Sequence, residues 1–377
     1  MLDPYLLPAA ELDELLHGEP AFRSRQVRQW LTRGITDPRV MSDLPVPLRA
    51  RLREHFPAAP TTLRHLTADG GLTQKVLLRL DDGEAIESVL LCYPSGPARS
   101  SGRATVCIST QAGCAMGCPF CATGQAGLRR QLRTDEVVAQ IVAAQRLLRT
   151  GSAVAGGPGD PRLRGHPGDG VPDHVTNVVF MGMGEPLANS EVTLATLRWL
   201  TDRDGFGLSA RGITVSTIGL VPGIRRLMRE QLPITLAISL HAPNYELRDQ
   251  LVPINRQHPL ASLLDACDEY VAATRRRLTF EYVLIDGVNA APQHASQLAA
   301  LLSPRRAHVN LIPMNPTPAV PWVAPDVAAQ RRFAGILTAA GLTATIRHNR
   351  GVGIEAACGQ LYADYRANSG ASLGRAS

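Results

Sequence analysis

The sequence predicts an α/β protein in which parallel strands form a partial barrel behind a small helical N-terminal domain. Short β-rich runs alternate with helical stretches from residue 104 to residue 347, which is the pattern of a parallel sheet with crossover helices. The first 85 residues lack this alternation and carry helical patterns instead. Six main repeats are too few for a closed eight-stranded barrel, so we expect a partial (β/α)6 barrel.

Residues 1–85 are expected to form the accessory domain. Helical patterns cover Leu12–Leu16 and Phe22–Arg33, and the second is rich in arginine. Its arginines are Arg23, Arg25, Arg28 and Arg33. Either this arginine face is simply solvated, or the domain contacts RNA phosphates, for which arginine is well suited.

A strand pair should follow the helices. Thr73–Leu80 and Ala85–Leu91 are β-rich and flank Asp81-Asp82-Gly83, a typical hairpin turn. The β-rich runs of the alternating part are Ala104–Ser109, Thr176–Met181, Gly212–Thr217, Ile234–Ser239, Leu278–Leu284, His308–Ile312 and Thr343–Arg347. The expected helices are Thr134–Leu148, Glu191–Asp202, Leu260–Thr274, Pro292–Leu302 and Val327–Ala340.

Two segments fall outside this alternation. Gly151–Asp173 is rich in Gly, Pro, Arg and Asp without any periodicity, which is typical of a flexible surface insertion. The tail 367–377 has a similar composition, and we expect it to be disordered. The predicted barrel domain therefore spans residues 86–366 and contains the insertion 151–173.

Composition and charge are those of a soluble enzyme. Hydrophobic residues make up 45% of the chain and charged residues 19%. The net charge of +6 favours a polyanionic partner, although only weakly, and Lys75 is the only lysine. We find no signal peptide and no apolar run of the about 18 residues that a membrane span needs. We therefore expect a cytoplasmic protein with no membrane partner.

Three cysteines form the strongest motif, Cys114-Ala-Met-Gly-Cys118-Pro-Phe-Cys121, directly after the first run of the alternating part. A closed structural zinc site needs four ligands, whereas three thiolates suit a four-iron cluster with one open iron. That iron could bind the amino and carboxylate groups of S-adenosylmethionine (SAM) and pass it an electron. A zinc site completed by a distant ligand, or reduced structural cysteines, would also fit the motif.

Polar residues follow four of the expected strands, where the functional groups of parallel barrels collect. In Gly182-Met183-Gly184-Glu185-Pro186 the glycines permit a close backbone approach, and the Glu185 carboxylate could hold the SAM ammonium. The other strand ends carry Ser216-Thr217, Ser239-Leu240-His241 and Asn315. These hydroxyl, imidazole and amide groups suit ribose and carboxylate recognition.

The cysteine spacing, with Phe120 before the last cysteine, resembles the signature of the radical SAM superfamily. Within it, the chain resembles the dual-specificity 23S rRNA and tRNA adenine-C2 methyltransferases of the RlmN type. The resembling segments are Phe22–Trp30, Arg103–Cys121, Asn177–Pro186, Phe206–Gly219, Ala237–Asn255, His308–Pro316 and Glu355–Leu361. The resemblance runs from about residue 20 to residue 365 and leaves out only the insertion and the tail.

The resemblance implies an enzyme that methylates carbon 2 of adenosine in 23S rRNA and certain tRNAs. Cys114, Cys118 and Cys121 would hold one [4Fe-4S] cluster per chain. Gly184, Glu185, Ser216, Ser239, Leu240, His241 and Asn315 would line SAM. Cys358 would be the cysteine that becomes S-methylated, Cys107 its partner thiol, and Glu87 a candidate proton acceptor. The implied partners of this monomer are 23S rRNA, tRNA and an electron donor such as flavodoxin.

The chemistry explains why two further cysteines are needed. Carbon 2 of adenine is electron-poor, so a polar methyl transfer to it is implausible. We hypothesise that one SAM methylates Cys358 by displacement, and that a second, cleaved at the cluster, gives a 5′-deoxyadenosyl radical. This radical would take a hydrogen atom from the Cys358 methyl group, and the methylene radical would add to carbon 2. After loss of an electron and of the carbon-2 proton, to Cys107 or Glu87, a transient Cys107–Cys358 disulfide would release the product.

Three other functions fit parts of the sequence. A resistance-type methyltransferase acting on carbon 8 would share the cluster and both cysteines, although Phe206-Gly207 and Glu355-Ala356-Ala357 favour the carbon-2 enzyme. A zinc-dependent RNA-binding protein would leave Glu185 unexplained. A radical SAM enzyme with a small-molecule substrate would leave the N-terminal domain unexplained. Finally, the arginines after the cluster, Arg129, Arg130 and Arg133, would either contact phosphate or form a solvated charge run.

Overall fold

The computed structural model of the chain describes residues 2–97, 100–151, 159, 170–203, 205–305, 307–347 and 349–361. Most of the predicted insertion 151–173 and all of the predicted tail 367–377 lie outside the described residues. Among the helices that are described, none is long and apolar enough to cross a membrane.

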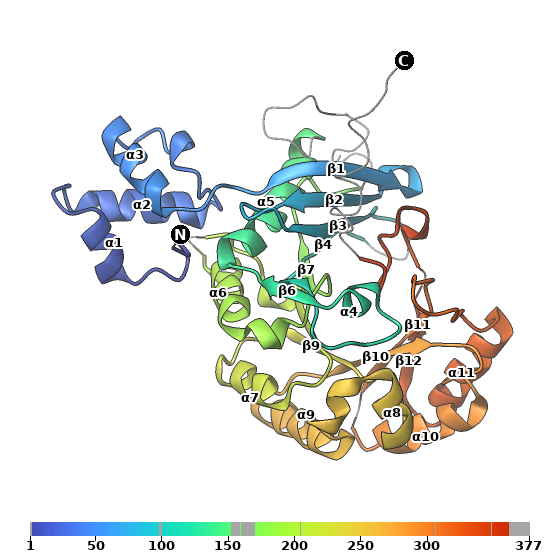
Figure 1. Cartoon of the computed structure of the whole chain (residues 1–377). Helices are drawn as coiled ribbons and strands as arrows, with labels where there is room; N and C mark the ends of the chain where they lie inside the picture. The colour runs from blue at the N-terminus through green and yellow to red at the C-terminus, as the bar shows by residue number, and fades with distance from the viewer. Residues whose placement is uncertain are drawn as a thin grey trace.

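The described chain contains one open sheet of ten strands, ordered β1-β2-β3-β4-β7-β8-β9-β10-β11-β12 (Figure 1). Its strands are β1 (Thr61–Ala68), β2 (Thr73–Arg79), β3 (Ala85–Tyr93), β4 (Arg103–Cys107), β7 (Asn177–Phe180), β8 (Ile213–Thr217), β9 (Thr235–Ser239), β10 (Thr279–Leu284), β11 (His308–Pro313) and β12 (Thr343–Ile346). The first four pair antiparallel, and every pairing from β4 to β12 is parallel. Because β1 and β12 are both edges, the barrel does not close.

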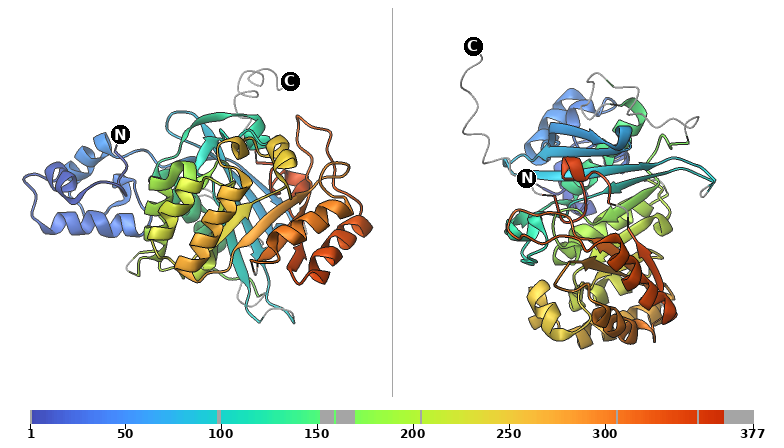
Figure 2. Two further views of the ribbon diagram at one scale, coloured as in Figure 1. Left: turned by 90° about the horizontal axis from the view of Figure 1, so that it is seen from below. Right: turned by 90° about the vertical axis from the view of Figure 1, so that its right-hand side faces the viewer.

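Helices connect the parallel strands and cover the outside of the curved sheet (Figures 1 and 2). They are α5 (Thr134–Thr150), α6 (Ser190–Thr201), α7 (Val221–Arg229), α8 (Tyr245–Leu251), α9 (Leu260–Thr274), α10 (Pro292–Leu302) and α11 (Val327–Ala339). α5, for example, buries Val137, Ile141 and Leu148 in the main apolar core. This arrangement of strand–helix units confirms the predicted partial barrel.

The predicted elements agree closely with this fold. The β2–β3 pairing confirms the hairpin, and α9 and α10 have the predicted ends. The sequence patterns missed β1, the helix α3 (Val46–His55), α7, α8 and a small hairpin of β5 (Gln111–Gly113) and β6 (Leu128–Gln131). α7 escaped notice because it begins Val-Pro-Gly, which is typical of a turn. β1 lies at the sheet edge, and its half-exposed residues show no alternation.

The N-terminal helices α1 (Ala9–Leu15), α2 (Phe22–Thr32) and α3 form a separate lobe beside the barrel (Figure 2). They have their own apolar core, which includes Leu12, Val27 and Leu48. The lobe is joined to α6 by Trp199, whose indole N–H donates to the carbonyls of Leu31 and Thr32 at 3.2 and 3.1 Å. The predicted domain boundary at residue 85 falls at the start of β3, within the antiparallel part of the sheet.

Candidate active site

A cavity opens at the carboxyl ends of the parallel strands and encloses about 960 Å³ of empty space, its mouth included. The loop after β5, the ends of β7 to β11 and the segment after β12 all contribute to its wall. The predicted site residues in the wall are Cys114, Cys118, Cys121, Gly184, Glu185, Ser216, Ser239, His241, Asn315 and Cys358. Only Glu87, Cys107 and Leu240 of the predicted set do not line this cavity.

The cluster loop leads from β5 into the short helix α4 (Ala122–Gln125). Cys114 and Cys118 are buried, and Cys121 is half-buried at the start of α4. The loop is held by a hydrogen bond from the Cys114 N–H to the Gly127 carbonyl at 3.0 Å and by one from Cys121 to Cys118 at 3.1 Å. The three sulfurs are therefore presented by a fixed backbone.

Electrostatics favour a cationic group among these thiols. Burial raises the pKa of Cys114 to about 12. Burial together with the Cys121 and Cys114 thiolates raises the pKa of Cys118, and burial together with the Cys358 thiolate raises the pKa of Cys121. Thiolates at this place therefore need a compensating positive charge, which iron supplies. Within the described ranges, no three His, Cys, Asp or Glu side chains group closely enough for a single metal ion. Three thiolates in one cavity wall are the donor set of a four-iron cluster with one open iron.

Glu185 joins the ends of β7 and β8. One carboxylate oxygen accepts the N–H of Leu187 at 3.0 Å and the other accepts that of Ile218 at 2.8 Å. Burial raises the pKa of Glu185 to about 7 despite these hydrogen bonds. An ammonium group in the cavity would therefore find a carboxylate that gains from a nearby positive charge.

The glycines before Glu185 allow close contacts within the protein. Gly184 has φ of +101°, and a Cβ added there would lie 2.6 Å from the Cβ of Gln111. A Cβ on Gly182 would lie 2.6 Å from the Ile108 carbonyl oxygen. The close approach that we expected for a ligand is thus made by the β4–β5 segment.

The ends of β8 and β9 lie side by side in the cavity wall. The Ser216 and Ser239 hydroxyls are 3.3 Å apart. His241 Nδ1 accepts the N–H of Val283 at 3.1 Å, and its ring packs edge-on against Phe120 of the cluster loop. Burial lowers the pKa of His241 to about 3, so the ring is neutral and its Nε2 carries the proton.

Leu240 is fully buried and contributes only its backbone near the cavity. Its carbonyl accepts from Nε of Arg248, a fully buried arginine of α8 that sequence reasoning missed. The same guanidinium donates to the Ile218 carbonyl at 2.6 Å and to Asn255 at 2.9 Å. Arg248 therefore ties the ends of β8 and β9 together behind the cavity, although no local sequence signal distinguishes it from the exposed arginines.

The segment with Cys358 lies against the cluster loop. The Gly359 carbonyl accepts the N–H of Ala122 at 2.8 Å, and the Leu361 carbonyl accepts the Thr123 hydroxyl at 2.5 Å. Asn315 donates to the Cys358 carbonyl at 3.0 Å. These hydrogen bonds bring Cys358 and the cluster cysteines, more than 200 residues apart in the sequence, to one cavity.

Cys107 ends β4 and is half-buried, and both it and Cys358 are free thiols. Burial, and then the Cys358 thiolate, raise the pKa of Cys107 to about 12. Glu87 lies on β3, and its carboxylate forms a buried ion pair with Lys75.

Two charged residues of the cavity wall, Glu281 and Arg347, were also missed by sequence reasoning. Glu281 is buried on β10 and accepts a hydrogen bond from Asn310 at 2.8 Å, and its burial raises its pKa. The Cys358 thiolate is the largest cause that raises the pKa of Arg347, followed by Glu281. A lone carboxylate within the apolar run Leu278–Leu284 was a signal for Glu281, because buried carboxylates are rare without a specific role.

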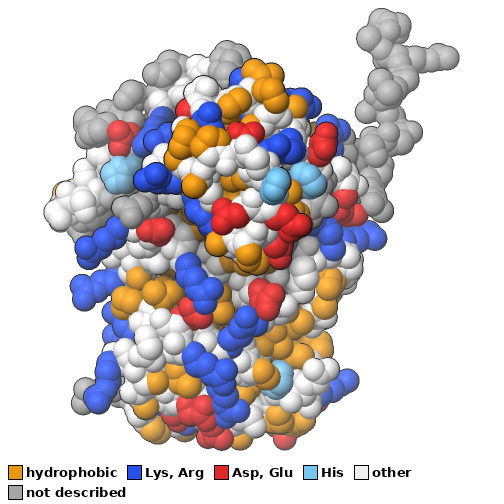
Figure 3. Space-filling model, turned by 90° about the vertical axis from the view of Figure 1, so that its left-hand side faces the viewer, with side chains coloured by type: hydrophobic (Ala, Val, Ile, Leu, Met, Phe, Trp, Pro, Cys, Tyr) orange, Lys and Arg blue, Asp and Glu red, His pale blue; other side chains and the backbone are white. Residues whose placement is uncertain are grey.

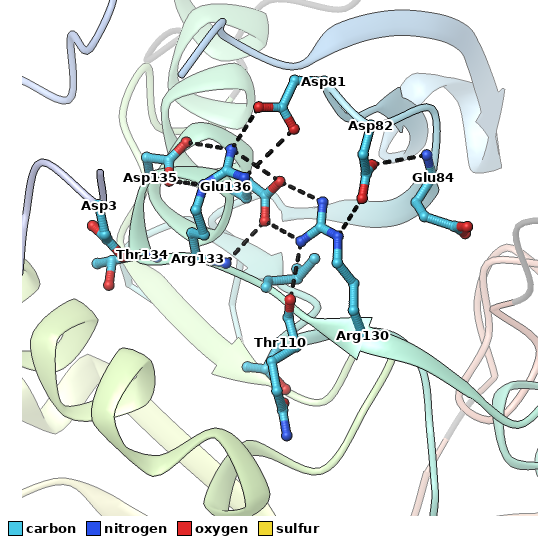
Figure 4. Close-up of polar contacts among 12 residues, drawn as sticks. Asp3, Asp81, Asp82, Glu84, Thr110, Arg130, Arg133, Thr134, Asp135 and Glu136 are labelled. Atoms are coloured by element: carbon cyan, nitrogen blue, oxygen red, sulfur yellow. Dashed lines mark hydrogen bonds and ion pairs between the residues drawn. The ribbon is translucent and has the colours of Figure 1, made fainter. Parts of the chain in front are cut away.

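Two of the three arginines after the cluster are engaged in ion pairs rather than free for phosphate (Figure 4). Arg130 binds Glu136 at 2.7 Å and also pairs with Asp82, whereas Arg133 binds Asp135 at 3.0 Å. Their carboxylate partners come from the β2–β3 turn and from the first turn of α5, so the network fastens the hairpin to the barrel. Of the three, only Arg129 is exposed.

Arginines of the N-terminal lobe are more accessible. Arg25, Arg28 and Arg33 are exposed on and just after α2. Figure 3 shows that blue Lys and Arg side chains are spread over this side of the molecule, with acidic side chains between them.

The chain is similar to known proteins over most of its length. A sequence model of the radical SAM superfamily matches residues 169–298. A probable dual-specificity RNA methyltransferase RlmN from a Parafrankia species is 52% identical over 92% of this chain and 87% of its own. One of the same name from Roseiflexus castenholzii is 47% identical over 95% of both chains. The crystal structure of a radical SAM methyltransferase from Sphaerobacter thermophilus has a TM-score of 0.81 and 48% identity, covering 95% of this chain and 98% of that chain.

Proposed function

The chain belongs to the RlmN family of radical SAM RNA methyltransferases, and on that premise we propose that it methylates carbon 2 of adenosine in 23S rRNA and in tRNA. Membership implies a [4Fe-4S] cluster and SAM. The observation that carries the proposal is that Cys358 lines the same cavity as Cys114, Cys118 and Cys121. Methyl transfer through an S-methylcysteine requires a nucleophilic thiol in the same cavity as the cluster cysteines.

Each proposed step uses a residue of this chain. When bound, the cluster supplies the electron that cleaves SAM. Cys358 loses its thiol proton and takes a methyl group from one SAM onto its sulfur. One hydrogen atom of this methyl group then passes to the radical fragment of a second SAM, and the carbon bonds to carbon 2 of adenosine. One electron would return to the bound cluster, and the Glu87 carboxylate takes the carbon-2 proton.

Cys107 then releases the product. Its thiolate attacks the Cys358 sulfur, so that a disulfide forms and the bond from sulfur to the transferred carbon breaks. That carbon takes up a proton and becomes the methyl group of the product. This pairing is supported by the strand register, which places Cys107 on the same sheet face as Lys75, whose Nζ donates to the Glu355 carbonyl three residues before Cys358. The turnover consumes two SAM molecules, and an external reductant such as flavodoxin supplies electrons.

Glu185, with Gly184 behind it, is proposed to receive the SAM amino group, and Ser216, Ser239, His241 and Asn315 its remaining polar groups. Leu240 lies behind this wall, where its carbonyl accepts from Arg248. Residues 1–85 are proposed to bind RNA through the exposed arginines of α2, next to a barrel of residues 86–366, with the chain acting as a monomer. The neutral state of His241 supports a role in hydrogen bonding rather than charge.

The product decides the proposal. We would reconstitute the holoenzyme anaerobically, supply reductant and SAM, and offer unmodified 23S rRNA fragments and tRNA separately. The RNA would be digested to nucleosides and analysed by mass spectrometry against standards. We expect 2-methyladenosine from both RNAs. An 8-methyladenosine product, or no modified adenosine from protein that cleaves SAM, would overturn the assignment.

A further inference from the structure

Lys75 is the only lysine of the chain, in which every other cationic side chain is arginine, and it is buried on β2. Its Nζ lies 2.8 Å from Oε1 of Glu87, and each of the two side chains is only 6% exposed. A buried charge is strongly unfavourable unless an opposite charge compensates for it. Lys75 and Glu87 therefore depend on each other in this place.

The same ammonium reaches the segment that carries Cys358. Nζ of Lys75 donates to the Glu355 carbonyl at 3.3 Å, three residues before Cys358. This segment lies directly on β2, because a Cβ added to Gly351 would be 2.7 Å from the Thr73 side chain. One side chain thus contacts both the carboxylate on β3 and the Cys358 segment.

Strand register places this ion pair on the face of Cys107. Lys75 is paired with Val89, and Val89 with Cys107, so the side chains of all three lie on one face of the sheet. Glu87 is two residues from Val89 and shares this face. The thiol, the carboxylate and the ammonium are thereby collected beside the Cys358 segment.

We propose that Lys75 is a positioning residue for proton removal, which keeps the Glu87 carboxylate charged and directed toward the Cys358 segment. The inference rests on the proposed function. In this step the C–H bond at carbon 2 breaks and its electron pair stays with the adenine ring. The proton forms an O–H bond on the Glu87 carboxylate. The neighbouring Lys75 side chain stabilises the carboxylate before this transfer.

Two substitutions remove the charge of Lys75 in different ways. Lys75→Met keeps the length and apolar stem of the side chain, and Lys75→Gln keeps hydrogen-bonding groups. Lys75→Arg retains the positive charge and serves as the conservative variant. Arg350→Met is the matched control, because Arg350 ties the same segment to Asp69 and to the Cys92 carbonyl without contacting Glu87.

The readouts separate the stages of the reaction in the reconstituted holoenzyme. They are iron content, S-methylation of the Cys358 peptide by mass spectrometry, covalent RNA–protein adduct on denaturing gels, and methyladenosine formed. With the charge removed, we expect normal iron content and normal Cys358 methylation. Adduct should accumulate, and product formation should fall at least tenfold. Lys75→Arg should recover product to within a few-fold of wild type.

The outcomes distinguish this inference from the proposed function. Wild-type product formation by Lys75→Met or Lys75→Gln, without adduct, would overturn the role of Lys75. So would the same adduct accumulation in Arg350→Met, because Lys75 would then only anchor the segment. If Lys75→Met does not fold, Lys75→Gln decides the result. If wild-type protein itself yields neither adduct nor product, the proposed function has failed.

Discussion

Replacing Gly184 by alanine should destabilise the loop that holds Glu185. Gly184 has φ of +101°, and the new Cβ would lie 2.6 Å from the Gln111 Cβ and 2.8 Å from its backbone nitrogen. The backbone conformation costs a side-chain-bearing residue about 1–3 kcal/mol, and the clash with a packed neighbour adds about 1–3 kcal/mol. We therefore expect a loss of about 2–6 kcal/mol in the free energy of unfolding.

Gly335→Ala is the matched control for this substitution. Gly335 is exposed in α11, and nothing lies within 4 Å of its added Cβ. Alanine in the interior of a helix should stabilise the protein by about 0.5–1 kcal/mol. Urea unfolding of the reconstituted proteins, followed by circular dichroism, would measure both. Equilibrium SAM binding should weaken in Gly184→Ala alone, since that loop carries Glu185. Equal urea midpoints for Gly184→Ala and wild type would refute the reasoning.

Three further predictions concern titration and release. Cys107→Ala should trap RNA covalently on Cys358, and normal turnover without an adduct on a denaturing gel would exclude the role of Cys107. Burial raises the pKa of Glu185 to about 7, so SAM affinity should fall about tenfold per pH unit below that value as the carboxylate is protonated. Glu185→Gln should lack this step in equilibrium binding, and a variant with the wild-type slope would argue against it. Burial also raises the pKa of Asp135 to about 7, above its value in the unfolded chain. The folded protein therefore binds this proton more tightly, and its contribution to stability is lost as pH rises toward 7. Asp135→Asn should flatten this slope in urea unfolding, and an unchanged slope would contradict the assignment.

Local patterns were sufficient for most of the fold. The starts of α9 and α10 are marked by Pro259 directly before one helix and Pro292 in the first turn of the other, where proline suits a helix start. Parallel strands place their carboxyl ends together, so the polar residues after each strand indicated one site before any geometry was known. The cavity contains Ser216, Ser239 and Asn315 for this reason.

Long-range pairing set the limit of the sequence analysis. The role proposed for Lys75 depends on its contacts with Glu87 and with the Glu355 carbonyl. Strand register brings Glu87 to Lys75, and the fold of the C-terminal segment brings Glu355. The ion pairs of Arg130 depend in the same way on the β2–β3 turn, so a run of arginines after the cluster had no distinguishing local signal. The role of a charged side chain depends on its burial and on the residue with which it pairs, and both are set by the tertiary structure.

The most direct test of the central claim is the isotope content of the methylated adenosine. The holoenzyme would first be freed of any methyl group carried over on Cys358 and then supplied with SAM that bears three deuterons on its methyl group. A methyl group that passes through the Cys358 sulfur and loses one hydrogen there should reach carbon 2 with two deuterons. Product that retains all three deuterons would show direct transfer from SAM and would contradict the account.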